Sequence, residues 1–230
     1  GPHERGVDPG GNWIGWDVPS PTEPREFFLE TRIEVENAGL SAPPRQLRET
    51  EPPNGFLGPD TFRQIDDPQV RSWAAASEIT DTLDVLRSHW RTLVSRMRYT
   101  GWDPLDRGAA FAVRAHGGDC SEFADLFAAL ARVRGIPARR VNGWTLDGTL
   151  AQRHAWTEVW LPSRGWTAFD PTWGATANAR FETVSTARAA IGWTLSGPEM
   201  GQQPYESWRW WGDPPIFRWH DSAWISNPTR

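Results

Sequence analysis

The strongest constraint on the fold is an apolar run with helical spacing. A Gly-Ile-Pro segment ends this run, and three strand-like runs follow it. Large apolar residues recur at the three- and four-residue spacing of one helix face, which predicts a helix over Ser121–Val133. Proline cannot continue a helix, so Gly135-Ile136-Pro137 is expected to end it. The next runs are short, apolar and separated by turn residues, which predicts strands over 140–146, 154–161 and 165–170.

Two more helices are expected before this one. Asp67-Pro68 fits the cap and the first position of a helix. A second run at helical spacing covers Leu83–Met97 and is expected to end near Tyr99–Gly101, where glycine can close the last turn. Residues 102–118 are then expected to form a loop. His89, on the second helix, is interpreted as a surface or satisfied packing residue.

The chain has a single cysteine, Cys120, which excludes an internal disulfide and every site that needs several cysteines. Gly117 and Gly118 precede it, so the backbone can turn sharply and leave the sulfur accessible. At the first turn of the helix, the thiolate is stabilised by the helix dipole, and the Cys120 N–H could hold an oxyanion. A lone cysteine is more often an inert core residue, so this position alone leaves both interpretations open.

Two downstream residues favour a nucleophile. His154 begins one predicted strand and Asp170 ends the next, with a short loop around Ser163 between them. If that loop has three residues, Asp170 lies opposite Trp156 and on the same face as His154, at a backbone separation of roughly 7–8 Å. A two-residue loop would put the carboxylate on the other face. The geometry therefore predicts a hairpin with an odd loop.

The chemistry of such a trio is nucleophilic catalysis. Cys120 would attack a carbonyl carbon, His154 would accept and return the proton, and Asp170 would orient the imidazole and stabilise its cation. His116 lies in the expected loop without an orienting carboxylate and ranks below His154 as the base. Asp119 and Glu122 flank the thiol and are interpreted as solvated or capping residues.

Three segments, in this order, resemble the core of the transglutaminase-like superfamily: GGDCSEFADLFAALARVRGIPARRVNGW (117–144), HAWTEVWL (154–161) and GWTAFDPTWG (165–174). Arylamine N-acetyltransferases share the Cys-His-Asp order, but the GIPAR, HAW and DPT elements favour the transglutaminase-like branch. The resemblance implies an α+β, papain-like fold, with the nucleophile's helix packed on an antiparallel sheet. It implies a Cys120–His154–Asp170 triad and no metal or organic cofactor.

The resemblance also suggests further site residues and leaves the reaction open. Some cross-linking members use a tryptophan to assist the oxyanion, which makes Trp102 a candidate, although packing is the commoner role of tryptophan. Trp156 and Glu158, on the histidine's strand, are candidates for contacts with the oxyanion or the substrate. Members form a thioester acyl-enzyme that water or an amine resolves. Hydrolysis of an amide and transfer to a primary amine are therefore both expected activities.

The composition limits the partners. The net charge of −5 gives no basis for a nucleic-acid or anionic-membrane surface, and no apolar run is long enough to span a bilayer. The substrate that the resemblance implies is a peptide, a protein or a small amide. The cytoplasm is slightly favoured over export, with a removed leader left open because the chain starts without methionine.

One domain with extensions is predicted: residues 1–66 as an arm, a strand at Phe27–Val35 and a Pro-rich wrap, 67–197 as the catalytic core, and 198–230 as a Trp-rich extension. The alternative function is a non-catalytic carbohydrate- or peptide-binding module that uses the Trp-rich surface. A carboxylate-pair glycosidase is disfavoured, since no acidic pair stands in a comparable motif.

Overall fold

The computed structural model describes residues 4–8, 11–15, 55–75, 79–147, 150–177, 181 and 190–193. The strand expected at Phe27–Val35 and the extension at 198–230 lie outside these residues. Within the N-terminal arm, β1 (Glu4–Asp8) and β2 (Gly11–Gly15) pair as antiparallel strands.

The first two helices begin at aspartate caps. α1 covers Pro68–Ala74, and the Asp67 carboxylate accepts hydrogen bonds from the backbone amides of Gln69 (2.9 Å) and Val70 (3.2 Å). α2 covers Thr82–Arg96, and Asp81 caps it in the same way. The Asp-Pro signal at the start of α1 is therefore confirmed, because the carboxylate satisfies amides that have no partner inside the helix.

The predicted end of α2 is wrong. Met97 adopts an extended backbone (φ −100°, ψ 149°), so the helix ends at Arg96 and not near Gly101. The next residues form β3 (Arg98–Tyr99), which pairs in parallel with β4 (Gly117–Gly118). A long-range backbone pairing thus ends the helix before its glycine. This pairing also brings Tyr99 beside Gly118, two residues before Cys120.

The expected loop at 102–118 contains a helix, α3 (Gly108–Ala115). Its first residue has φ +76°, and a Cβ there would lie 2.5 Å from the Phe62 carbonyl oxygen, so only glycine fits. Ala109, Ala112 and Val113 are buried in the core. Small side chains gave a weak apolar pattern in the sequence, whereas in the fold they allow α3 to pack closely.

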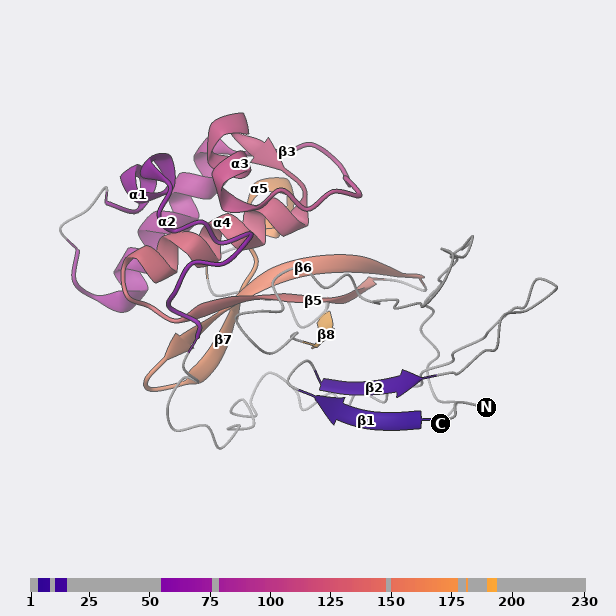
Figure 1. The fold of residues 1–230 in the computed structure, drawn as a ribbon. Coiled ribbons are helices and arrows are strands. Elements are labelled where there is room, and N and C mark those ends of the chain that lie inside the picture. The colour runs from indigo at the N-terminus through magenta and orange to yellow at the C-terminus, as the bar shows by residue number, and fades with distance from the viewer. Residues whose placement is uncertain are drawn as a thin grey trace, which may run out of the picture.

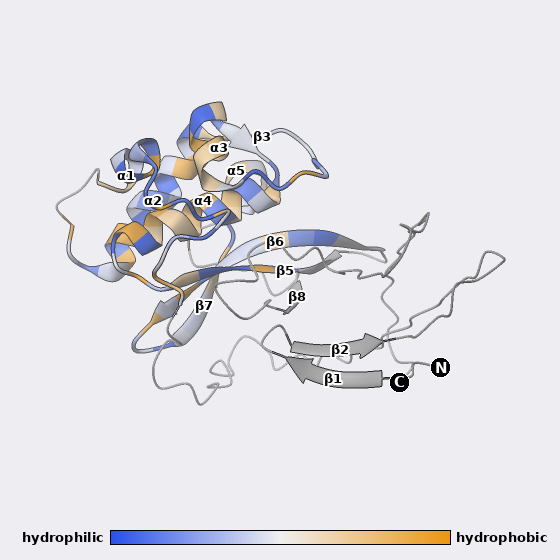
Figure 2. Cartoon of the chain, viewed as in Figure 1, coloured by the Kyte–Doolittle hydropathy of each residue, from blue (hydrophilic) through white to orange (hydrophobic). Residues whose placement is uncertain are grey.

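The cysteine helix, α4 (Cys120–Val133), is the centre of the core, with almost every residue buried. It begins one residue before the predicted start and ends where predicted, with Gly135 in the left-handed region at φ +72°. Hydrophobic residues alternate with hydrophilic ones along the helices, as expected for elements buried on one side (Figure 2). Within the described residues, none of the helices is both long and apolar enough to cross a membrane.

The helices gather on one side of a four-stranded sheet (Figure 1). The sheet is antiparallel, in the order β7-β6-β5-β8. Its strands are β5 (Ala138–Asp147), β6 (Leu150–Leu161), β7 (Gly165–Phe169) and β8 (Ala190–Trp193). The Thr157 hydroxyl donates to the Ala124 carbonyl of α4 at 2.8 Å, which joins the helix to the middle of β6. The α+β class and the helix-on-sheet arrangement are therefore confirmed.

A fifth helix, α5 (Pro171–Ala177), follows β7 directly, where the sequence analysis predicted no helix. Asp170 caps it: its Oδ1 accepts from the Trp173 amide at 3.2 Å, and its carbonyl accepts from the Gly174 amide at 3.3 Å. A Cβ on Gly174 would lie 2.6 Å from the Trp90 ring of α2, so glycine allows the two helices to approach. Asp170-Pro171 is the same cap signal as at α1.

A buried ion network joins the segment before α1 to α4 and β5. The Asp125 carboxylate, fully buried, accepts from Arg63 and from Arg140 at 2.9 Å each. Asp60 pairs with Arg63 and with Arg132 at 2.8 Å each. Buried charges are stable only when they are paired, so this network fixes which surfaces of α4 and β5 meet.

Replacing Asp125 by asparagine is expected to lower the free energy of unfolding by about 3 kcal/mol, because two buried guanidinium groups each lose a partner charge. Urea unfolding measures this change. The matched control is Asp66→Asn, which breaks an exposed pair with Arg71 and should cost less than about 1 kcal/mol. Equal effects of the two variants would contradict a special role of the buried network.

Candidate active site

Cys120 is the first residue of α4, and its side chain is partly exposed. The helix start is closed by a capping box: Asp119 Oδ1 accepts from the Ser121 amide at 2.7 Å, and Glu122 Oε2 accepts from the Asp119 amide at 3.0 Å. The Cys120 N–H is the amide of this turn that neither bond uses. The thiol therefore lies at the positive end of the helix dipole, where a thiolate is favoured.

The two carboxylates beside the thiol do cap the helix, but they are not solvated as the sequence suggested. Asp119 and Glu122 are 3% and 2% exposed. Burial, opposed by the Arg107 amide and reinforced by the Asp119 charge, raises the pKa of Glu122 from 4.5 to about 7. The loop before α3 covers both groups: the Asp103 amide donates to Asp119 Oδ2 at 3.1 Å, and the Arg107 amide donates to Glu122 Oε1 at 2.9 Å.

The predicted hairpin register is confirmed. Leu161 pairs with Gly165 across a three-residue turn, and Thr157 pairs with Phe169 at the other end of the ladder. Asp170 follows Phe169 directly and lies where the register predicts it. His154 Nε2 and Asp170 Oδ2 are 2.6 Å apart, and both side chains are buried.

His154 also contacts the nucleophile. The ring forms a hydrogen bond with the Cys120 side chain, and since Nε2 is engaged by Asp170, Nδ1 is the nitrogen available to the thiol. Burial lowers the pKa of His154, but the hydrogen bonds and charges of Asp170 and Cys120 outweigh it and raise the pKa from 6.5 to about 10. The structure thus brings together the three residues that the sequence selected, and it favours an imidazolium between two acidic groups.

Two tryptophans hold the imidazole ring. Trp173 of α5 stacks on it with 5.0 Å between ring centroids and 9° between the planes. Trp156 of β6 stacks at 6.3 Å and 24°. The Trp173 amide also donates to Asp170, so this one residue contacts two members of the trio. Sequence reasoning missed Trp173; the available signal was its place in the first turn after Asp170-Pro171.

The raised pKa of His154 predicts that stability depends on pH. A group whose pKa is higher in the folded state than in the unfolded state stabilises the fold. For His154 this contribution is complete when the pH lies below the unfolded pKa, about 6.5, and it is lost as the pH rises through the folded pKa, about 10. Urea unfolding from about pH 6 to about pH 10 should show a loss on the order of a few kcal/mol. Glu122, whose pKa is raised to about 7, also titrates in this window, so the contribution of His154 is taken from a comparison with a variant. His154→Gln should have a much flatter profile, and identical profiles would contradict the prediction.

The structure does not bring Glu158 to the trio. Glu158 lies four residues along β6 from His154, which is about 13 Å of strand. Its Oε2 accepts from Arg139 at 2.9 and 2.8 Å, and the Arg139 guanidinium lies 4.0 Å from the Trp166 ring centroid. The ion pair between Glu158 of β6 and Arg139 of β5 supports a role in joining these two strands.

The other two histidines among the described residues, His89 and His116, have structural positions. His116 ends α3 in the left-handed region (φ 51°), and its ring packs edge-on against Trp73 at 5.3 Å. The sequence suggested that His89 is either on the surface or packed with its hydrogen bonds satisfied, and neither holds in full. His89 is 2% exposed, and its Nδ1 has no hydrogen-bond partner among the described residues. Burial lowers the pKa of His89 to about 4, so its ring is neutral at pH 7. The apolar face of α2 places this histidine inside the core.

Trp102 lies in the loop before α3 and is 77% exposed. Its neighbour Asp103 is bonded to Asp119, so the loop is attached one residue from Cys120. An exposed indole on a loop attached there can contact a substrate. The role of Trp102 in stabilising an oxyanion stays a prediction.

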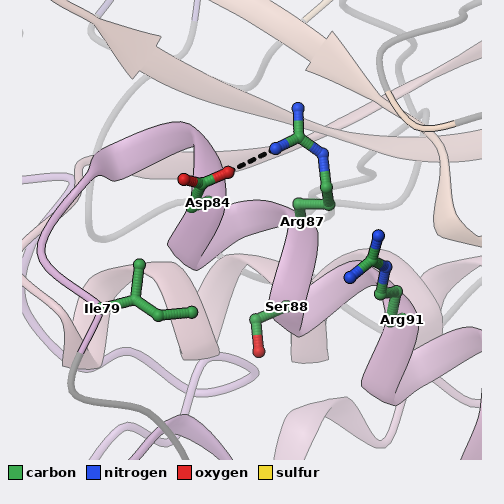
Figure 3. A pocket seen from close by; sticks show the side chains of 5 residues that line it. All are labelled: Ile79, Asp84, Arg87, Ser88 and Arg91. Carbon is green, nitrogen blue, oxygen red and sulfur yellow. Dashed lines mark hydrogen bonds and ion pairs between the residues drawn. The ribbon is translucent and has the colours of Figure 1, made fainter.

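A separate pocket of about 260 Å³ is lined by Ile79 and by four residues of α2 (Figure 3). Its wall includes Arg87, Ser88 and Arg91, and Arg87 forms an ion pair with Asp84. None of the candidate catalytic residues lines it. Among the described residues, His, Cys, Asp and Glu side chains form no group of three or more that could hold a metal ion.

Comparison with known proteins gives two curated relatives. The uncharacterized protein YebA of Bacillus subtilis (strain 168) is 35% identical over 83 residues, or 30% of this chain and 11% of that protein. A protein-glutamine gamma-glutamyltransferase of Pseudomonas aeruginosa is 29% identical over 125 residues, or 50% of this chain and 18% of that protein. The matches thus span between about a tenth and a fifth of these relatives' lengths.

Among solved structures, a chain from Cytophaga hutchinsonii, described provisionally as a cysteine protease, is 23% identical with a TM-score of 0.47. That match covers 61% of this chain and 46% of the other. The family model of the transglutaminase-like superfamily matches residues 72–171, a range that includes Cys120, His154 and Asp170. Within residues 72–171, the chain is therefore similar to the transglutaminase-like superfamily.

Proposed function

We propose that the protein catalyses acyl transfer at an amide carbonyl through a thioester on Cys120. The observation that carries this proposal is the place of the His154 ring, which bonds to Asp170 and to the Cys120 thiol. A histidine that only packs in the core does not need hydrogen bonds to both a thiol and a carboxylate. A nucleophile, a base and an orienting acid that act together need both of these hydrogen bonds.

The first half-reaction forms the acyl-enzyme. Cys120 Sγ, as the thiolate, attacks the carbonyl carbon, and the carbonyl oxygen becomes an oxyanion to which the Cys120 N–H can donate. The C–N bond then breaks, and the imidazolium of His154 gives its proton to the departing amine. Asp170 keeps the ring oriented through the 2.6 Å contact at Nε2. The products are a thioester on Cys120 and a free amine or ammonia.

The second half-reaction releases the acyl group. Now neutral, His154 takes a proton from an incoming water or primary amine, whose oxygen or nitrogen attacks the thioester carbonyl. The C–S bond breaks and the sulfur leaves as the thiolate beside the protonated ring. Water gives a carboxylic acid and an amine gives a new amide, so the acceptor alone decides between hydrolysis and transfer.

One relative is named a protein-glutamine gamma-glutamyltransferase, which makes a glutamine side chain the first acyl donor to test. Glutamine-containing peptides would be incubated with the protein, with and without a primary amine such as cadaverine, and analysed by mass spectrometry. Conversion of glutamine to glutamate indicates hydrolysis, and attachment of the amine indicates transfer. Peptides cleaved at the backbone would indicate a peptidase.

Alkylation of Cys120 tests the chemistry independently of the donor. Iodoacetamide should modify Cys120 stoichiometrically near neutral pH, because the helix start and His154 favour the thiolate. Blocking the thiol should abolish every activity found in the donor screen. A thiol that resists alkylation in the folded protein would contradict the proposed function.

A further inference from the structure

The loop between β3 and α3, residues 100–107, is attached at three points to the residues that flank the nucleophile. The Thr100 amide donates to the Gly118 carbonyl at 3.0 Å. The Asp103 amide donates to Asp119 Oδ2 at 3.1 Å, and the Arg107 amide donates to Glu122 Oε1 at 2.9 Å. The start, middle and end of this loop therefore each bond to the segment 118–122.

Glu122 is the centre of this attachment. One of its oxygens accepts from the loop at Arg107, and the other accepts from Asp119, the residue before the nucleophile. The side chain is 2% exposed, and its hydrogen-bond donors are backbone amides. A buried carboxyl group is costly unless it is hydrogen-bonded, so these bonds hold the loop and the helix start in one arrangement.

Gly118 makes room for this carboxyl group. A Cβ at Gly118 would lie 2.4 Å from the Glu122 Cβ and 2.7 Å from its Cγ. The glycine next to the cap therefore serves the close fit of Glu122 as well as the turn into α4. This is a second reason for the Gly-Gly pair before Asp119.

The attached loop carries exposed apolar side chains. Among the described residues, the structure has four exposed large hydrophobic side chains, and three of them lie in or beside the loop: Tyr99 (44% exposed), Trp102 (77%) and Leu105 (63%). Tyr99 pairs with Gly118, two residues before the nucleophile. Apolar surface that the core does not bury, fixed beside a reactive thiol, fits an apolar group of a substrate.

We propose that Glu122 is a positioning residue that holds loop 100–107 against the start of α4 and so presents Trp102 to an apolar, aromatic side chain of the acyl donor. This inference rests on the proposed function, because it takes Cys120 as the nucleophile. It assigns to Trp102 a part in donor specificity, and to Glu122 an effect that passes through the loop.

Two alkylating reagents test this role without a known substrate. Iodoacetamide is small and reports the reactivity of Cys120 alone. Benzyloxycarbonyl-phenylalanine chloromethyl ketone reacts with the same thiol by displacement of chloride, but its aromatic groups can also contact the loop. In Trp102→Ala, the second-order rate constant for the aromatic reagent should fall about tenfold, through weaker reversible binding, while the iodoacetamide rate changes less than about twofold.

Glu122→Ala should lower the ratio of the aromatic-reagent rate to the iodoacetamide rate about as much as Trp102→Ala does, since it releases the loop that carries the indole. The double variant Glu122→Ala/Trp102→Ala should lose no more than either single variant, because both remove one shared contact. Glu122→Gln keeps a carbonyl acceptor for one of the two amides, so it should recover at least about a third of the aromatic rate. If the alanine variant fails to fold, the glutamine variant, alone and combined with Trp102→Ala, gives the same comparison.

The matched control is Leu57→Ala, which removes another exposed apolar side chain (47% exposed). Its neighbour Gly58 bonds to Arg132, at the opposite end of α4 from Cys120, so both rates should be unchanged. The inference is overturned if the Glu122 variants keep the wild-type rate ratio, or if the losses from Glu122 and Trp102 multiply in the double variant. An unreactive thiol toward both reagents would instead overturn the proposed function.

Discussion

Replacing Cys120 by alanine is expected to abolish the covalent acyl-enzyme and all turnover that depends on it. The chain has no second cysteine that could substitute. The thiolate at the start of α4 supplies the bond that carries the acyl group between the two half-reactions. Intact-protein mass spectrometry with a glutamine-containing peptide donor measures the acyl adduct, and product analysis measures turnover.

Cys120→Ser is the matched control for this prediction, because it keeps the size of the side chain and the capping box around it. Its hydroxyl is a much weaker nucleophile at this position, since its pKa lies far above that of a thiol. Both variants should unfold at nearly the wild-type urea concentration. Turnover by Cys120→Ala at a rate near that of the wild type would contradict the nucleophile assignment.

Removing the base is expected to have an effect nearly as large. His154→Ala should lower kcat by about 10³-fold or more, because no other described group takes the place of a ring that bonds both the thiol and Asp170. The same variant should slow iodoacetamide alkylation near neutral pH, where the wild-type imidazolium stabilises the thiolate. Single-turnover kinetics separates loss of acylation from loss of deacylation.

His116→Ala serves as the control, since His116 packs against Trp73 at the end of α3 and should leave kcat within about threefold of the wild type. A second comparison separates two roles of Asp170. Asp170→Asn keeps an acceptor for Nε2 but removes the charge, whereas Asp170→Ala removes both. If both variants turned over at the wild-type rate, His154 would need no orienting acid and the triad assignment would fail.

The helices show where local sequence is sufficient and where it is not. α4 has a regular apolar face, a cap and a glycine stop, and its predicted bounds differ by one residue at the start. α2 ended earlier than its periodicity indicated because β3 pairs with β4, a contact between residues far apart in the chain. α5 was missed although Asp170-Pro171 repeats the signal used for α1, since its side chains show little helical periodicity.

For the candidate site, the sequence identified Cys120, His154 and Asp170 and predicted the hairpin register that places the last two side by side. It did not single out Trp173, because stacking on an imidazole is a contact between elements and the cap signal at Asp170-Pro171 gives no information about it. For Asp119 and Glu122 it left solvation and capping open; the structure shows capping, with both side chains buried under a loop bound by backbone amides. Such contacts follow no residue spacing.

By itself, the sequence determined the elements whose physics is local: the cap and apolar face of α4, the strands after it, and a hairpin whose loop length fixes the faces of His154 and Asp170. Only the tertiary structure decided the environment of those side chains. The burial of Glu122, the stacking on His154 and the shift of the His154 pKa to about 10 arise from groups on different elements. Desolvation and charge interactions depend on distance in space, and residue spacing specifies that distance only within one helix or one hairpin.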